Sequence, residues 1–458
     1  MKKYIFSLFA ALALVSCTEY LDIKPYGKEI PEDVEDFSAL LHHLCDDIDN
    51  GNTLAGPIMG LYSDAGALEA VTDNMEVNLT ESPGGDMLRG YIGHFAVSTS
   101  YTNLYEAIRT CNIVLDEIGN ARDTREGLDL IGTAYAIRGV CYYQLMRHFC
   151  APPLAEDGTL GVPIVTTFDM EAKPVRSTMQ ETIDQIERDF KAAIECDIQE
   201  PMYRFNSDIM HGYLARLYHW CGRWQEARDE ALQVLAKHPL IEGDDYKAMI
   251  NKQFGLAGNR LIMSNIYGST LILTSYYNTL KARPISVRYI NLFPASEADI
   301  RKTFFFNAKR QSTKTCFAGM RSAEMAFIAM EAAYHLGNPT TALKELNDFR
   351  RKRISPYTDL TMTTLPAIRD DEYIKEDCNG NVLTPLLYNI LTERRKEFFM
   401  ENADRFYELK RNGRPEWWIM YRGLKYWNQK FMYTWPLPIT DIELQPGLIQ
   451  NPGYDEAI

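Results

Sequence analysis

The stretch that decides the fold runs from Leu386 to Lys410 and reads LLYNILTERRKEFFMENADRFYELK. Steps of four and three residues along it mark one face of an α-helix. That face carries Leu387, Leu391, Arg394, Phe398, Glu401, Arg405 and Leu409. The spacing therefore predicts one continuous helix whose inward face mixes apolar and charged side chains.

The charges on this face have to be neutralised, because an isolated ion in a protein interior costs several kcal/mol or more. Glu401 and Arg405 are i,i+4 neighbours, as are Glu397 and Glu401, so we expect a local network. We predict a structural charge network formed by Arg394, Glu397, Glu401 and Arg405. A catalytic pair at Glu397 and Glu401 is disfavoured, because glycoside hydrolysis needs two carboxylates that flank a bound sugar across a cleft.

The composition is that of a globular protein. The 458 residues are 46% hydrophobic and 24% charged, enough for a sizeable core. The formal net charge of -14 argues against nucleic acid or an anionic membrane surface as a direct partner.

The first residues form a targeting signal. Lys2 and Lys3 precede an apolar run from Tyr4 to Val15, which is too short to span a bilayer. The run ends in Leu14-Val15-Ser16-Cys17, the pattern of a bacterial lipobox. We therefore predict a lipoprotein signal peptide over 1–16, with lipid attachment at Cys17 and stable anchoring by several acyl chains. The alternative is an ordinary secretory signal with a chance cysteine.

The remaining cysteines show no CxxC pair and no zinc-binding pattern. We predict no disulfide framework, and we expect Cys111, Cys141 and Cys221 to be buried thiols on helix faces. The acidic run from Asp46 to Gly51 does not fit a calcium loop, because no glutamate follows at position twelve. The sequence thus predicts no metal and no cofactor.

Helical spacing dominates the chain after residue 100. Apolar residues recur at helical intervals over 104–118 and 128–149, and Ser177 with Gln180 predicts a capping box for the next helix. Half of a tetratricopeptide pattern follows: Ala215, Tyr218, Gly222, Trp224, Ala227, Ala231, Val234 and Pro239. A weaker echo lies at Gly337, Ala342, Leu346 and Phe349.

Such helix pairs must stack on neighbours to bury their faces. We therefore expect a mainly α fold, a tetratricopeptide-like helix-pair scaffold over 101–240 and 320–411. The segment 241–319 differs in composition and holds short apolar runs of strand length among many aromatics. It predicts a loop-rich insertion with short strands.

Several motifs resemble those of the SusD/RagB family of outer-membrane nutrient-binding lipoproteins. The family signature RRxExxxExxRxxDLxR is matched at Arg394, Arg395, Glu397, Glu401, Arg405, Leu409 and Arg411. Ala403 stands where the family often has Gly, Glu408 where it usually has Asp, and Gly139 where it prefers Ala. The opening Leu21-Asp22 with Pro25 and the ending Asn451-Pro452-Gly453-Tyr454 are also similar, so the resemblance covers nearly the whole chain.

The resemblance implies a SusD-like domain over 17–458. Its parts are an N-terminal segment 17–100, helical repeats 101–240, the insertion 241–319, and C-terminal helices with a tail over 320–458. It also implies a lipid-anchored protein on the outer membrane that faces the cell exterior. Such a protein captures oligosaccharide or polysaccharide and delivers it to a SusC-like TonB-dependent channel, and it is not an enzyme.

Three alternatives stay open. The same architecture could bind peptides or another nutrient, because family members are not all glycan binders. A tetratricopeptide-type envelope assembly scaffold is a second class, and an outer-membrane glycosidase is the third. No G-x-S-x-G, HExxH or P-loop motif supports an enzyme.

The ligand site is expected where loops carry aromatics beside polar side chains, because a sugar ring has apolar C–H faces and a rim of hydroxyls. The loop before the first repeat helix and the aromatics of the insertion offer this combination. The predicted ligand-binding residues are Asp73, Asn74, Arg89, Tyr91, Tyr101, Tyr276, Tyr277 and Tyr289.

Overall fold

The computed structural model describes residues 31, 33–50, 68–76, 99–169, 171–251, 263–264, 283–314, 319–421, 424–445 and 447–454. Cys17 and the predicted ligand residues Arg89, Tyr91, Tyr276 and Tyr277 lie outside these ranges. Within the described part, no helix has both the length and the apolar character needed to cross a membrane.

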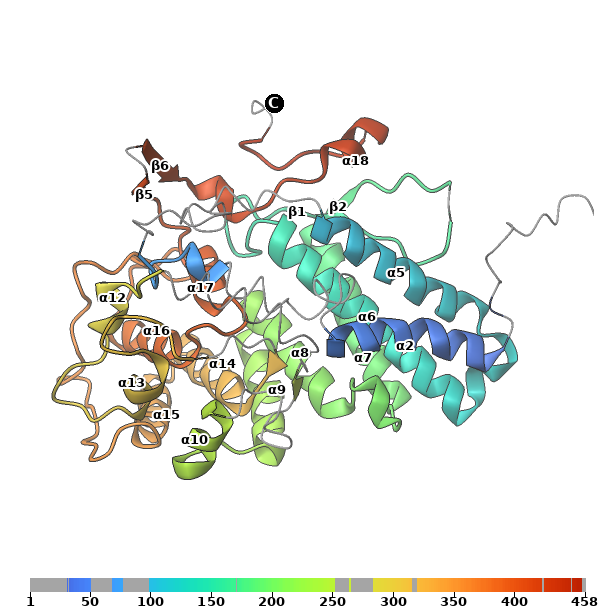
Figure 1. Ribbon diagram of the computed structural model, residues 1–458. Helices are drawn as coiled ribbons and strands as arrows, with labels where there is room; N and C mark the ends of the chain where they lie inside the picture. The colour runs from blue at the N-terminus through green and yellow to red at the C-terminus, as the bar shows by residue number, and fades with distance from the viewer. Residues whose placement is uncertain are drawn as a thin grey trace, which may run out of the picture.

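Helices from the first half of the chain pack against one another largely in sequence order, α5 on α6, α6 on α7, α7 on α8 and α8 on α9 (Figure 1). The elements are α2 (Val34–Asn50), α5 (Thr99–Glu117), η3 (Gly119–Asp123), α6 (Arg125–Phe149), α7 (Met179–Cys196), η4 (Pro201–Tyr203), α8 (Ser207–Trp220) and α9 (Trp224–Lys237). A large apolar core runs between them. Cys111 and Cys141 are fully buried in it, as predicted, whereas Cys221 is partly exposed.

The second half continues the same stack, because α14 packs directly on α9 and then on α15 and α16 (Figure 1). Its elements are α10 (Gly243–Asn251), α12 (Val287–Ile290), α13 (Ile300–Phe305), α14 (Ser322–His335), α15 (Pro339–Arg351), α16 (Pro385–Glu397), α17 (Asp404–Arg411), η7 (Lys430–Tyr433) and α18 (Ile439–Leu444). The described strands form three antiparallel pairs: β1 (Leu160–Pro163) with β2 (Arg176–Thr178), β3 (Met263–Ser264) with β4 (Gly319–Met320), and β5 (Trp417–Tyr421) with β6 (Leu424–Asn428). The predicted mainly α, helix-pair fold with short strands is confirmed.

The turns of the two predicted repeats have the expected geometry. Gly222, between α8 and α9, has φ +71°, and Gly337, between α14 and α15, has φ +76°. This left-handed conformation carries a steric penalty for residues with a Cβ atom, so glycine is the residue that suits both turns. The capping box of α7 lies one residue later than predicted. Thr178 and Glu181 form it, because β2 extends through Thr178.

The predicted continuous helix over 386–410 is wrong. The structure divides it into α16, which ends at Glu397, and α17, which begins at Asp404. Met400, Asn402 and Ala403 in the link have φ values of +63°, +51° and +53°, which no α-helix accommodates. Ala403 is the position where the family often has Gly, so the family pattern already carried the signal for this break.

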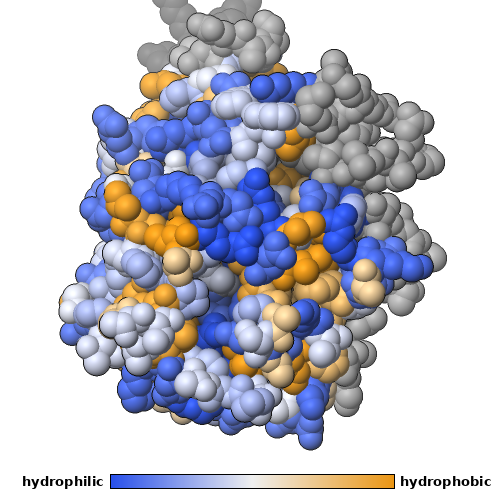
Figure 2. All heavy atoms as spheres, turned by 90° about the vertical axis from the view of Figure 1, so that its left-hand side faces the viewer, coloured by the Kyte–Doolittle hydropathy of each residue, from blue (hydrophilic) through white to orange (hydrophobic). Residues whose placement is uncertain are grey.

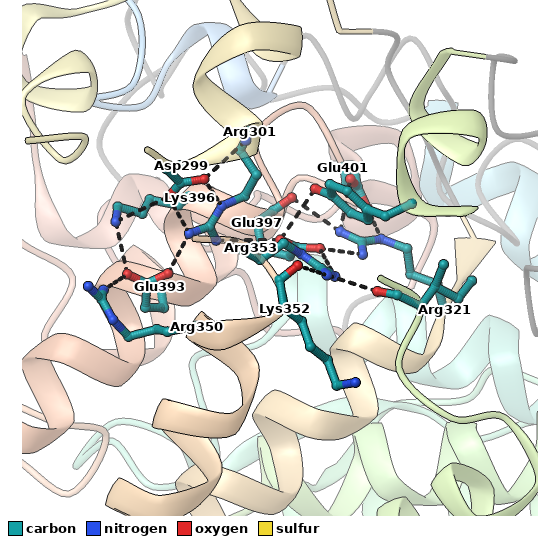
Figure 3. A network of polar contacts seen from close by, with 12 residues as sticks. Asp299, Arg301, Arg321, Arg350, Lys352, Arg353, Glu393, Lys396, Glu397 and Glu401 are labelled. Atoms are coloured by element: carbon teal, nitrogen blue, oxygen red, sulfur yellow. Dashed lines mark hydrogen bonds and ion pairs between the residues drawn. The ribbon is translucent and has the colours of Figure 1, made fainter. Parts of the chain in front are cut away.

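Glu397 and Glu401 lie at the centre of a buried charge network (Figure 3). Arg321 bridges them, with Nη1 2.7 Å from Glu397 Oε1 and Nε 2.7 Å from Glu401 Oε2. Arg353 donates to Glu397 at 3.0 Å, and Lys314 donates to Glu401. Both carboxylates are fully buried, so their charges are met by cations rather than by water.

The network extends to Glu393, which accepts from Arg301 at 2.6 Å and from Lys396 at 2.9 Å, and also binds Arg350. The expected local pairing along the helix is wrong: Glu401 takes its partners from the segments before α14. The reason is the break in the helix, which turns Arg405 towards Asp73 instead.

Replacing Glu397 with Gln removes one buried charge and leaves the surrounding guanidinium groups unbalanced. We expect Glu397→Gln to lower the free energy of unfolding by about 3–5 kcal/mol, the usual cost of breaking a buried pair. Urea denaturation followed by circular dichroism measures it. The matched control is Asp348→Asn, which breaks exposed pairs with Lys344 and Arg351 and should leave the midpoint unchanged. A Glu397→Gln midpoint equal to that of the wild type would contradict a structural role for the network.

Acid should weaken the fold in a defined pH range. Burial alone would raise the pKa values of Asp73, Glu393 and Glu397, but neighbouring arginine and lysine charges hold them well below the ordinary 3.8 for Asp and 4.5 for Glu. At pH values above these ordinary pKa values, the ionised carboxylates stabilise the fold. This stabilisation is lost progressively as the pH falls below them. Each carboxylate should then contribute a loss of about 1.4 kcal/mol per pH unit. Urea unfolding at a series of pH values tests this, and equal stability at about pH 5 and about pH 3 would contradict it.

Candidate functional site

A hollow of about 330 Å³ lies where the N-terminal segment, the end of the insertion and the β5–β6 hairpin meet. We call it the hairpin pocket. It is lined by Thr72, Asp73, Met75, Glu76, Arg283, Ser286, Val287, Arg288, Tyr373, Trp417, Trp418 and Ile419. Its volume falls at the lower end of the range for small-molecule sites.

Backbone pairing holds the walls together. Met75 forms an isolated antiparallel bridge with Ile285, and Glu76 N donates to the Pro284 carbonyl at 2.8 Å. Ser286 then donates from Oγ to the Asp73 carbonyl at 2.6 Å. Two segments some two hundred residues apart in the chain therefore form one rigid wall.

Another part of the lining is aromatic. Trp417 is buried and stacks on Tyr373, with ring centroids 5.0 Å apart and an interplanar angle of 13°. Trp418 is 50% exposed, because successive side chains of a strand point to opposite faces. The guanidinium carbon of Arg288 lies 4.2 Å from the centre of the Tyr373 ring. The pocket thus combines flat apolar surfaces with a cation.

The two carboxylates of the pocket differ in availability. Burial would raise the pKa of Asp73, but Arg395 and Arg405 hold it well below the usual range, and both arginines already bind its oxygens at 3.0 and 2.7 Å. Glu76 is partly exposed and accepts from Val287 N at 3.1 Å. Glu76 is therefore the carboxylate that can meet a ligand.

Two predicted ligand residues are wrong as direct contacts. Asn74 is fully buried, where it donates to Glu69 at 2.7 Å and accepts from Arg395 at 2.6 Å. Tyr289 is also fully buried, because it stacks on Phe399 in an apolar cluster and donates to the Lys396 carbonyl at 3.1 Å. Neither side chain is accessible to a molecule from solvent.

Tyr101 and Asp73, predicted as parts of one site, line different hollows. Tyr101 borders a hollow of about 410 Å³ together with Tyr105, Glu106, Arg109, Asp169 and Asp441. Its ring is 5% exposed and packs edge-on against Phe149 at 5.1 Å. Asp73 therefore lies beside Ser286 of the insertion, whereas Tyr101 lines a different hollow.

Sequence reasoning missed the aromatic wall. Trp417, Trp418 and Tyr373 belong to the C-terminal part of the chain, where the tail is rich in aromatics but no spacing tied them to residues 72–76. Two adjacent tryptophans on a strand were the usable signal, since one of them must then point outward.

A third hollow, of about 920 Å³, lies beside α13 and the end of α15 and carries Lys247, Lys302, Arg351 and Lys352 among its lining residues. It lacks the aromatic wall of the hairpin pocket. The face of the molecule that includes α12, α13 and α15 shows small hydrophobic patches separated by hydrophilic side chains (Figure 2). The hairpin pocket is thus the described hollow best suited to a ligand with apolar faces and a polar rim.

Comparison with known proteins gives a consistent result. The family described as "Starch-binding associating with outer membrane" matches residues 19–219, and the SusD family matches residues 300–454. No curated protein matches the sequence.

Solved structures resemble the fold over nearly the whole chain. A SusD superfamily protein from Bacteroides thetaiotaomicron is 19% identical and has a TM-score of 0.65, with 92% of this chain and 100% of that chain covered. A SusD-like carbohydrate binding protein from Bacteroides vulgatus is 17% identical with a TM-score of 0.67, covering 91% and 98%. A laminarin binding SusD-like protein is 15% identical with a TM-score of 0.60, covering 93% and 100%.

At these identities the structural likeness concerns the fold, and the two sequence matches carry the assignment. Together they span both halves of the chain, including the helix pair α16 and α17 and the C-terminal tail. The chain therefore belongs to the SusD/RagB family of carbohydrate-binding, outer-membrane-associated proteins.

Proposed function

We propose that this protein captures oligosaccharide or polysaccharide at the cell surface and delivers it to a SusC-like TonB-dependent outer-membrane transporter. The observation that carries the proposal is the hairpin pocket, whose lining includes the half-exposed indole of Trp418 together with Arg288 and Glu76. An indole face covers the apolar C–H face of a pyranose, and charged side chains hydrogen-bond its hydroxyls.

The pocket suits binding rather than bond cleavage. Glycoside hydrolysis needs two carboxyl groups that flank the scissile bond. Of the two carboxylates in the pocket, Asp73 is held ionised and is already occupied by Arg395 and Arg405. Among the described residues that line the pocket, Glu76 is then left without a partner carboxyl group, and we propose a binding protein without enzymatic activity.

The family assignment supports a glycan ligand. A structural neighbour is named for laminarin binding and another for carbohydrate binding, and the family description refers to starch and to the outer membrane. The sequence-predicted residues Arg89, Tyr91, Tyr276 and Tyr277 remain part of the proposed site. They belong to segments that join its rim along the chain at Glu76 and Arg283.

Incubation of the protein with starch-derived and laminarin-derived oligosaccharides tests the proposal. We expect a change in tryptophan fluorescence on binding, with no increase in reducing ends. Release of reducing ends would indicate a glycosidase instead. Binding of peptides with no response to any glycan of a broad panel would indicate the peptide-binding alternative. Co-purification from detergent-solubilised membranes tests the transporter as partner.

Truncation of the exposed indole should weaken glycan binding. We expect Trp418→Ala to reduce affinity for a bound oligosaccharide by about tenfold, equivalent to about 1.4 kcal/mol, at unchanged melting temperature. Isothermal titration calorimetry measures it. The matched control is Trp427→Ala, which removes an indole of 42% exposure from the paired strand but does not line the pocket. Equal losses in both variants would place the glycan on the outer face of the hairpin, and wild-type affinity in Trp418→Ala would exclude the pocket.

The anchor is tested separately. We expect Cys17→Ser to abolish lipid attachment, because only the cysteine thiol accepts the lipid. The variant should move from the membrane fraction to the soluble fraction, while glycan affinity of the purified protein stays unchanged. Membrane retention of Cys17→Ser in cell fractionation would contradict lipid anchoring at this residue.

A further inference from the structure

The carboxylates that line the hairpin pocket are already paired with cations. Asp73 binds Arg395 and Arg405, at 3.0 and 2.7 Å. Glu76 Oε1 lies 3.5 Å from Nη1 of Arg310, an exposed arginine at the end of the insertion. Among the described residues of the lining, the negative charges are therefore largely offset by neighbouring guanidinium groups.

Arg288 is a cation of the same lining that forms no ion pair with any described residue. Its Nη1 donates to the backbone carbonyl of Asp371 at 3.2 Å, and a carbonyl carries no formal charge. The carboxylate of Asp371 is itself bound by Arg369, which donates to its two oxygens at 2.8 and 2.9 Å. The positive charge of Arg288 thus lacks a matching negative charge.

Aromatic stacking holds the Arg288 guanidinium in place. Its central carbon lies 4.2 Å from the centre of the Tyr373 ring. Tyr373 in turn stacks on the buried Trp417 at 5.0 Å. A planar guanidinium fixed in this way is ordered before a ligand arrives, so little conformational entropy is lost when it forms hydrogen bonds.

A second cation lies beside the aromatic lining. Nζ of the exposed Lys425 is 4.5 Å from the centre of the Trp418 ring and 5.8 Å from that of Trp427. Like Arg288, Lys425 forms no ion pair with the part of the chain that the structure describes. The surroundings of Trp418 and Tyr373 therefore carry positive charge that the protein does not neutralise.

This charge distribution favours an anionic ligand. A neutral sugar that covered Arg288 would take its charge out of water without supplying an opposite charge, which is unfavourable. A carboxylate or sulfate group supplies that charge, and the guanidinium fork matches two of its oxygens. The net charge of -14 does not oppose such a ligand, because salt screens exposed charges beyond about 8 Å.

We propose that the hairpin pocket binds an anionic glycan, whose carboxylate or sulfate group pairs with Arg288 while Lys425 adds attraction from the side of Trp418. The inference rests on the proposed glycan-binding function and narrows the ligand to acidic sugars. Arg288 is then the residue that distinguishes acidic from neutral chains, because a neutral chain leaves its charge unpaired.

Matched pairs of oligosaccharides test the proposal by isothermal titration calorimetry. One pair is a galacturonic acid oligosaccharide and its methyl ester, and the other is a sulfated galactan oligosaccharide and its desulfated form. We expect the acidic member of at least one pair to bind at least about tenfold more tightly than its neutral partner. The pair that shows this preference identifies the anionic group as carboxylate or sulfate. The preference should shrink between about 50 and about 500 mM NaCl, because salt screens the attraction.

Substitutions locate the anionic group. We expect Arg288→Gln to reduce the preference for the acidic member to about threefold or less, and Arg288→Lys to keep part of it, because lysine retains the charge but lacks the fork. The control is Lys302→Gln, which removes a cation that borders the third hollow and should keep the wild-type preference. An unchanged preference in Arg288→Gln would overturn the site, as would an equal loss in Lys302→Gln.

The wild-type protein decides the ligand class even if Arg288→Gln misfolds. Equal affinity within both pairs, or tighter binding of neutral starch or laminarin oligosaccharides than of either acidic one, would overturn the preference for an anionic glycan and leave glycan binding intact. No binding of any acidic or neutral glycan would overturn the proposed function itself, and the inference with it.

Discussion

The fold depends on pairing two fully buried carboxylates, Glu397 and Glu401, with cations from other parts of the chain. Arg321 contacts both carboxylates, while Arg353 contacts Glu397 and Lys314 contacts Glu401. These cations come from the end of the insertion and from the residues that flank α14 and α15. The carboxylates therefore specify which segments must converge on α16, and a chain that failed to bring them together would bury bare charge at a cost of several kcal/mol.

The same helix pair also positions the candidate site. Arg395 of α16 and Arg405 of α17 both bind Asp73, and Arg395 reaches Asn74 as well. These contacts fix the position of residues 68–76, of which 72–76 form one wall of the hairpin pocket. A candidate site on loops needs rigid support. Here the support comes from the ion pairs of Arg395 and Arg405 with Asp73. This explains why Asp73 borders the pocket although its own oxygens are fully engaged.

The helix-pair architecture could be predicted because its signals are local. Gly222 lies at a tight turn, and the small alanines that follow it are buried between helices. The break before Asp404 could not be read from apolar spacing, since Glu401 and Arg405 keep helical intervals across it. Tyr289 looked like a loop aromatic for a similar reason: only tertiary packing on Phe399 shows that it is core. Partners of buried charges are the least predictable, because Asp73 and Arg405 are 332 residues apart.

Buried ion pairs of this kind seldom add net stability, because desolvation of the charges offsets most of their attraction. Such ion pairs can instead favour one packing arrangement of the chain over others. Apolar side chains at positions 397 and 401 would pack acceptably in several registers, whereas a carboxylate that needs Arg321 on one side and Arg353 or Lys314 on the other is satisfied in one. The hairpin pocket benefits from that uniqueness, because its lining comes from four separate parts of the chain, 72–76, 283–288, Tyr373 and 417–419. The charges thus act through geometry, by allowing one relative placement of the segments that line the hairpin pocket.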